Sequence, residues 1–249
     1  KVIEGNASFR DSRTVVVGHD RDIKFEIKAR RFVIATGSVP AVPTIPGLEQ
    51  TPFLTNETVF GIRERPKHLI VIGAGAVGLE LAQAFRRLGS DVTVLEAAQP
   101  LADEDPQAAA VVLEALTREG VTIRSGVAVA RVRRVRNKIE VVLGRETGET
   151  VEGSHLLIAT GRRPNVASLN LEAARIKLGA AGIAINRSFG TTNKRVYAIG
   201  DATGRVRSTH AANHQAGLLV RQLFFRLPVK FDRSEEHTSE LQSPYVISY

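Results

Sequence analysis

The 249-residue sequence contains no cysteine, which excludes disulfides, thiolate catalysis and cysteine-ligated metal within these residues. It also lacks any apolar run of about 18 residues, so no transmembrane helix is expected. The basic, strand-like start at Lys1 does not resemble a signal peptide. With 43% hydrophobic residues, the chain can bury a substantial core. We therefore predict a globular protein of the cytoplasm with no metal site and no membrane partner.

Acidic residues are fewer than basic ones: the chain has 26 Asp and Glu and 34 Lys and Arg, which gives a formal net charge of +8. Such a balance raises the possibility of nucleic-acid binding. However, the densest arginine cluster, at residues 131–136, alternates with valines in a manner typical of one solvated sheet face. No nucleic-acid motif or set of stacking aromatics accompanies the charge. We expect no nucleic-acid partner.

The first part of the chain shows short strand-like runs broken by polar turn residues, which predicts a small β-meander ending in a buried strand. These runs lie at residues 2–3, 14–17, 23–27 and 32–34. Residues 37–47 follow with three prolines at a spacing of three, which favours an extended linker outside any sheet.

From Pro66 onward, strand-like and helix-like runs alternate, which predicts a parallel sheet with right-handed crossovers. The strands are expected at 69–72, 92–95, 121–123 and 155–158, and the helices at 77–88 and 106–118. Strand-like runs at 127–135 and 139–143 predict an antiparallel insertion. A last strand and a last helix are expected at 196–199 and 209–225.

The clearest motif is GAGAVG at residues 73–78, between an apolar run and an amphipathic run. In a Rossmann unit the first glycine makes a tight turn, the second lets a pyrophosphate approach the backbone, and the third permits close helix packing. The helix N-terminus supplies N–H groups to the phosphates. The alternative is a glycine-rich turn that only packs a helix. We predict that a dinucleotide binds at Gly73, Gly75, Ala76, Val77 and Gly78.

Glu96 ends the next strand-like run, about 20 residues after the motif, where a ribose-binding acid is expected. A carboxylate accepts hydrogen bonds from a ribose 2′-OH but repels a 2′-phosphate. Residues 97–99 contain no arginine that would pair with such a phosphate. The sequence therefore favours NAD(H) over NADP(H). Glu80 has two interpretations: a first-turn carboxylate that complements the helix dipole, or a ligand contact.

Two strand-like runs end in Ala-Thr-Gly, at residues 35–37 and 159–161, and a third ends in Gly-Asp at 200–201. An acid directly after a strand and a glycine lies at the carboxyl edge of a sheet, where it can accept hydrogen bonds from ligand hydroxyls. Each motif alone is a weak signal. In this order around a dinucleotide motif they are specific.

On these motifs the chain resembles the class I pyridine nucleotide-disulfide oxidoreductases, nearest the dihydrolipoamide dehydrogenase and mercuric reductase group. The resemblance covers residues 1–232 and rests on residues 35–38, 73–80, 96, 159–165 and 200–201. It implies an α/β fold with β-meander insertions, in which one Rossmann-like domain interrupts another. The NAD-binding domain would span 65–162, inside an incomplete FAD-binding domain formed by 1–64 and 163–232.

The resemblance also implies site residues, none of them catalytic within these residues. For NAD(H), it adds Val127 and Gly161, and it places Glu80 near the nicotinamide and the flavin. For FAD, it places Asp201 at the ribitol. A helix beginning near His210 would aim its N-terminus at the flavin, where a partial positive charge stabilises an anionic reduced ring. The remaining FAD contacts would come from Ala7, Thr36, Gly37 and Ser38.

Several family features are expected outside these residues: the first FAD-binding glycine motif, the CxxxxC redox disulfide and the C-terminal dimerisation domain. This fragment alone is therefore expected to be inactive, and the intact parent is expected to be a homodimeric enzyme. Residues 233–249 resemble the translation of a sequencing-library adapter, so we expect a non-biological tail there.

The resemblance implies an FAD-dependent oxidoreductase that transfers a hydride from or to NAD(H), via the flavin, to a disulfide or a related acceptor. Two alternatives stay open. One is a disulfide-free NADH:flavin oxidoreductase of the NADH oxidase or transhydrogenase type. The other is a non-enzymatic NAD-sensing module, although such a module has no use for the Ala-Thr-Gly and Gly-Asp set.

Overall fold

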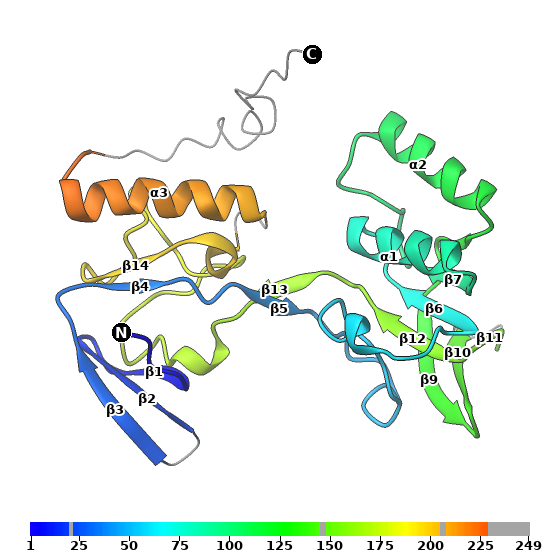
Figure 1. The fold of residues 1–249 in the computed structure, drawn as a ribbon, viewed down its shortest axis with the longest axis horizontal. Coiled ribbons are helices and arrows are strands. Elements are labelled where there is room, and N and C mark those ends of the chain that lie inside the picture. The colour runs from blue at the N-terminus through cyan, green and yellow to red at the C-terminus, as the bar shows by residue number, and fades with distance from the viewer. Residues whose placement is uncertain (20–21, 145–147, 205–207, 229–249) are drawn as a thin grey trace. The chain divides into compact units, whose positions relative to one another are not determined.

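The structure is a computed structural model that describes residues 1–19, 22–144, 148–204 and 208–228. The chain divides into two compact units (Figure 1): an outer unit, Lys1–Val39 with Arg163–Tyr249, and an inserted unit, Pro40–Arg162. The inserted unit thus includes residues 40–64, which the sequence analysis assigns to the FAD-binding part. The nucleotide bound by each unit stays a prediction. The expected non-biological tail lies outside the described residues.

The inserted unit is built on a four-stranded sheet whose paired strands are all parallel. The chain runs from β6 (His68–Ile72) through α1 (Ala76–Arg87), β7 (Asp91–Leu95) and α2 (Pro106–Arg118) to β8 (Thr122–Arg124). β12 (His155–Ile158) pairs with β6 on its other side, which gives the order β12-β6-β7-β8. The predicted α/β class and parallel sheet are confirmed. β6 is central, and its apolar sequence is buried on both faces, as parallel strands require.

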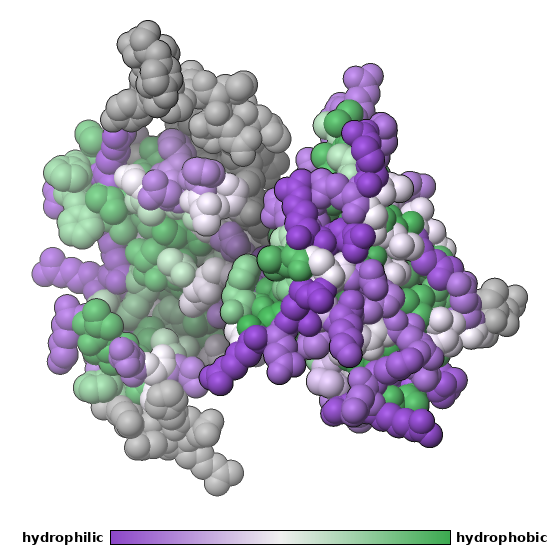
Figure 2. Space-filling view, turned by 45° about the vertical axis from the view of Figure 1, so that its right-hand side comes forward, coloured by the Kyte–Doolittle hydropathy of each residue, from purple (hydrophilic) through white to green (hydrophobic). Residues whose placement is uncertain are grey.

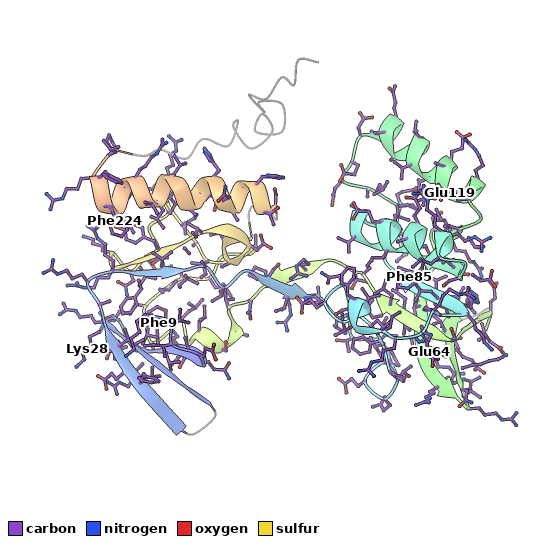
Figure 3. All side chains as sticks on the ribbon, viewed as in Figure 1. Phe9, Lys28, Glu64, Phe85, Glu119 and Phe224 are labelled. Atoms are coloured by element: carbon purple, nitrogen blue, oxygen red, sulfur yellow. The ribbon has the colours of Figure 1, made fainter. Side chains whose placement is uncertain are left out.

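The amphipathic pattern of α1 explains how the glycine motif is anchored. Leu79, Ala82 and Phe85 form its buried face and pack on Leu69 and Val71 of β6. Phe85 lies between the helix and the sheet (Figure 3). This packing fixes the N-terminus of α1 at the carboxyl end of β6.

The opposite face of the parallel sheet is covered by an antiparallel sheet in the order β11-β10-β9. Its strands are β9 (Val129–Val135), β10 (Lys138–Leu143) and β11 (Thr150–Gly153). The sequence predicts the first two but not β11, which is short and ends in a glycine. β11 forms because its backbone pairs with the preceding strand β10, from Ile139↔Gly153 to Val142↔Thr150.

The proline-rich segment does enter a sheet, so its predicted position outside any ladder is wrong. β5 (Ser38–Pro40) pairs with β13 (Arg162–Pro164). Of the three residues of β5, only Pro40 lacks a backbone N–H, and a proline is tolerated at the end of an edge strand. Farther along, the Pro46 carbonyl accepts the Val132 N–H at 2.9 Å, so the segment lies against β9.

The outer unit begins with a meander of β1 (Asn6–Asp11), β2 (Thr14–His19) and β3 (Asp22–Lys28). The strand predicted at residues 2–3 is wrong, because the tight turn between Asp11 and Thr14 sets the register and pairs Asn6–Asp11 with β2. β4 (Phe32–Ile34) pairs in parallel with β14 (Val196–Ala198). Phe9 and Ile34 belong to the core on one side of this pair.

The long helix α3 (Thr209–Phe225) matches its predicted bounds, because Ser208 caps its first turn and Arg226 ends it in a left-handed conformation. Leu219 packs with Phe189 and Tyr197 of the outer unit. Three short 3-10 helices complete the described elements: η1 (Val59–Gly61), η2 (Ala167–Leu169) and η3 (Gly200–Thr203).

The surface of the inserted unit that faces the viewer in Figure 2 is mostly hydrophilic, with apolar groups in small areas. Across the described ranges, no helix combines the length and apolar character needed to cross a membrane.

Candidate functional site

The turn between β6 and α1 requires glycine at its first position. Gly73 adopts φ +108°, a conformation that side chains rarely allow, and a Cβ there would lie 2.4 Å from the Ala159 carbonyl oxygen. The Gly73 N–H also donates to the Leu95 carbonyl at 2.9 Å. The turn is therefore held between β12 and β7 at the carboxyl end of the sheet.

The other two glycines of the motif differ in their surroundings. A Cβ on Gly78 would lie 2.2 Å from the Gly73 carbonyl oxygen, so this glycine permits the close approach of helix and loop. Gly75 has open space where its side chain would be. It is the N-cap of α1, and no side chain caps the first turn. N–H groups at this end of the helix can therefore bind a ligand anion.

Glu96 is tied to the glycine loop through its carboxylate. Its Oε2 accepts the Ala74 N–H at 2.8 Å, and its Oε1 accepts the Ala98 N–H at 2.9 Å. Each carboxylate oxygen has further acceptor capacity, so ribose hydroxyls can also bind there. Glu96 therefore holds the loop in position in addition to the ribose role that the sequence predicts.

These groups surround a cleft of about 410 Å³ at the carboxyl end of the sheet. Six predicted residues line it together: Gly73, Gly75, Ala76, Val77, Glu96 and Gly161. Gly161 has φ +100°, and a Cβ there would meet no atom within 4 Å, so it opens onto the cleft. The sequence analysis missed a further wall formed by the loop after β7, because that loop carries no motif. It comprises Ala98, Gln99, Leu101, Ala102 and Asp103.

The cleft presents negative side chains and no positive ones among its described lining residues. Glu96 and Asp103 are its ionisable groups. The adjacent strand carries Arg124, whose carbonyl accepts the Glu96 N–H, but its guanidinium donates two hydrogen bonds to Glu149 at 2.7 and 2.6 Å. These bonds raise the pKa of Arg124 and lower that of Glu149. This arginine is therefore already engaged.

Three predicted residues do not line this cleft. Gly78 lies beneath it and supports the packing described above. Val127 packs in the core, and its N–H donates to the Glu96 carbonyl at 3.0 Å. Glu80 lies in the second turn of α1, which has no acidic residue in its first turn, so the helix-dipole interpretation is wrong. Glu80 lines a separate cleft between α1 and α2.

In the outer unit, the two halves of the predicted FAD site meet. The Ser38 hydroxyl donates to Oδ2 of Asp201 at 2.6 Å across 163 residues of sequence. The Gly-Asp turn is held by Gln215 of α3, whose side-chain oxygen accepts the Gly200 N–H at 2.8 Å. The sequence analysis missed Gln215. A glutamine only 1% exposed on the inner face of a helix signals such a role, but its burial is not visible in the sequence.

Ala7 and Thr36 line a smaller pocket of about 150 Å³, together with apolar residues of the outer core. Gly37, with φ +68°, accepts the Asn165 N–H through its carbonyl at 2.9 Å. His210 is exposed on the first turn of α3 and contributes to neither the pocket nor the Asp201 contact. Within the described residues, no group of three or more His, Cys, Asp or Glu could hold a metal ion.

A glycine turn between the first strand and helix of an inserted parallel sheet defines a dinucleotide-binding type of α/β protein. The family model for pyridine nucleotide-disulphide oxidoreductases matches residues 1–216. The chain belongs to this family.

Two relatives illustrate the similarity to known reductases. The chain is 36% identical over 237 residues to the mercuric reductase of Lysinibacillus sphaericus, covering 94% of this chain and 42% of that protein. It is 39% identical over 216 residues to the mercuric reductase of Acidithiobacillus ferrooxidans, covering 85% of this chain and 38% of that protein.

Among solved structures, the HOCl-induced flavoprotein disulfide reductase RclA of Escherichia coli superposes with a TM-score of 0.85 at 30% identity. This match covers 92% of this chain and 52% of RclA. The chain thus spans about two fifths of the mercuric reductases and half of RclA.

Proposed function

We propose that the protein containing this chain is an FAD-dependent oxidoreductase. It transfers a hydride between NAD(H) and the flavin, and passes electrons to a disulfide or a related acceptor. The observation that carries this proposal is the dinucleotide cleft, in which the glycine turn, the uncapped end of α1 and the tethered Glu96 converge. The similarity to mercuric reductases and to a flavoprotein disulfide reductase supports the same class of activity.

The inserted unit binds NAD(H) in this proposal. N–H groups at the start of α1 hold the pyrophosphate, which approaches over the open side of Gly75. Glu96 accepts hydrogen bonds from the adenosine ribose while it holds the glycine loop. Gly161 leaves room for the nicotinamide half of the molecule, since its open side faces the same cleft.

The outer unit contributes to FAD binding. Asp201 fits this role because Ser38 orients one carboxylate oxygen, while the other has no partner among the described residues and can accept a ribitol hydroxyl. Ala7 and Thr36 line a small pocket of the same unit. When bound, FAD supplies the exchange of two electrons with the nicotinamide. The chain's own contribution is to bind and orient both nucleotides.

The preferred nucleotide is NAD(H) rather than NADP(H). A 2′-phosphate would lie near Glu96 in a cleft that also contains Asp103 and is lined by no described lysine or arginine. Repulsion between like charges disfavours NADP(H) there. We further propose that the parent acts as a homodimer in the cytoplasm on a small-molecule or disulfide substrate.

The test uses the intact parent, obtained by recovering the reading frame on both sides of this chain. It should purify yellow, and anaerobic NADH should bleach the flavin absorbance. Gly75→Val should retain flavin but lower kcat/KM for NADH about tenfold or more, because the side chain obstructs the pyrophosphate. Gly61→Val is the matched control, since Gly61 also has open space around it but lies outside the cleft.

The same preparation separates the alternatives. A colourless parent that binds NADH would support the sensing module and contradict the proposal. A yellow parent in which NADH generates no new titratable thiols would support the disulfide-free oxidoreductase, whereas two new thiols per subunit support a disulfide reductase.

A further inference from the structure

We propose that Gln215 of α3 is a positioning residue for FAD: it holds the Gly-Asp turn, η3, so that Asp201 is oriented before the cofactor binds. This role rests on the proposed function, because it takes FAD as the ligand of Asp201. Gln215 itself is only 1% exposed, so it acts through the turn and not by touching the cofactor.

Both backbone polar groups of Gly200 are held by buried side chains. Its N–H donates to the Gln215 side-chain oxygen at 2.8 Å, and its carbonyl accepts the Thr203 hydroxyl, also at 2.8 Å. Gly200 is buried, and Thr203 is 3% exposed. Water is therefore not available to replace either bond, and an unpaired buried N–H is costly. The two bonds favour a single conformation of the turn, in which Gly200 has φ +63°.

Packing confines the same turn at two further points. A Cβ on Gly200 would lie 3.3 Å from the Cβ of Ala212 in α3, so the helix approaches the turn closely. The Ile183 N–H donates to the Ala202 carbonyl at 3.0 Å, which attaches the turn to the chain that precedes β14. Gln215 adds a directional bond between the helix and the turn, which apolar packing alone does not supply.

Asp201 is thereby held through both its backbone and its side chain. Its backbone follows Gly200 directly, and its Oδ2 accepts the Ser38 hydroxyl at 2.6 Å. A carboxylate that is already oriented loses less conformational freedom when a ribitol hydroxyl binds to it. Loss of the Gln215 bond should therefore weaken FAD binding, although it removes no group that touches FAD.

The same helix contains a matched control for Gln215. Gln222 lies seven residues later, about two helical turns along α3 and on the same side of the helix. Its side-chain oxygen is buried and has no hydrogen-bond partner among the described residues. Replacing either glutamine by methionine removes a side-chain amide and leaves a side chain of similar length. Only at position 215 does the change break a bond to the Gly200 N–H.

The test measures the dissociation constant of FAD in the intact parent, which is stripped of its flavin and titrated with FAD while flavin fluorescence is followed. Gln215→Met should raise this constant about tenfold, the effect of one buried hydrogen bond. Gln215→Glu should stay within about threefold of the parent, because a carboxylate accepts the same N–H. Gln222→Met should leave the constant unchanged. Thr203→Val, which releases the carbonyl of the same glycine, should also weaken FAD and replaces Gln215→Met if that variant does not fold.

Thermal unfolding with and without FAD separates positioning from stability. In Gln215→Met the rise in Tm that FAD produces should shrink, whereas a purely structural role would lower Tm equally in both states. An unchanged FAD dissociation constant in the variants that release Gly200, or equal weakening by Gln215→Glu and Gln215→Met, would overturn the role of Gln215 alone. A parent that binds no FAD would contradict the proposed function and this role together.

Discussion

Glu96 illustrates how one side chain can serve both the loop and the ligand. Its carboxylate accepts N–H groups on either side, from Ala74 in the glycine loop and from Ala98 after β7. Hydrogen bonds to a charged acceptor are stronger than neutral ones, about 1.5–3 kcal/mol each. A substitution at this position should therefore alter both the shape of the loop and the charge of the ribose pocket.

We predict that Glu96→Arg lowers the ratio of kcat/KM for NADH to that for NADPH about tenfold or more in the intact parent. The change removes a carboxylate that repels a 2′-phosphate and introduces a cation that attracts it. Glu96→Gln serves as the size-matched control. It should weaken NADH with a smaller gain for NADPH, because it removes the charge without adding a cation. An unchanged ratio in Glu96→Arg would refute the proposed specificity role.

At the scale of elements, the proline-rich segment has a packing role that its composition conceals. Gly47 has φ +82°, and a Cβ there would lie 2.0 Å from the Val132 carbonyl oxygen of β9. The neighbouring Pro46 carbonyl accepts the Val132 N–H. The segment is thus attached to β9 at a point where only a glycine fits.

We predict that Gly47→Ala lowers the free energy of unfolding by about 2–4 kcal/mol, because left-handed strain adds to an unavoidable backbone clash. Gly126→Ala is the control, since Gly126 has φ +69° but open space around it, and it should cost only about 1 kcal/mol. Urea unfolding of both variants measures the difference. An equal loss of unfolding free energy in the two variants would show that close packing of the proline-rich segment against β9 does not contribute to stability.

At the scale of the whole molecule, each unit has its own core. The inserted unit buries Leu157 among residues of both its helices, and the outer unit buries Ile183 among residues of its strands. Both side chains are at most 1% exposed. Because these cores share no residue, the two units should unfold as separate cooperative blocks.

We predict two thermal transitions by calorimetry, of which NADH raises only that of the inserted unit. Leu157→Ala should lower the transition temperature of the inserted unit, and Ile183→Ala should lower that of the outer unit. Each substitution should reduce the free energy of unfolding of its own unit by about 2–5 kcal/mol. The two variants act as controls for one another. A single transition that both variants lower together would contradict independent cores.

Local sequence determined much of this protein. α2 matches its predicted bounds because Asp105 caps its first turn, where a proline follows, and a glycine follows its end. The glycine motif could be located partly because Gly73 has a positive φ and Gly78 packs against the Gly73 carbonyl, five residues earlier, and both requirements are local. The alternating strand and helix pattern likewise predicted the parallel sheet.

Tertiary structure alone decided the rest, because the partners lie far apart in the chain. Pairing with β13 brings β5 into a sheet. The Glu96 carboxylate accepts the N–H of Ala74, 22 residues away, and the Ser38 hydroxyl donates to Asp201 across 163 residues. Burial and long-range hydrogen bonds arise only when the chain is folded, so they determine which of the expected residues meet in one cleft.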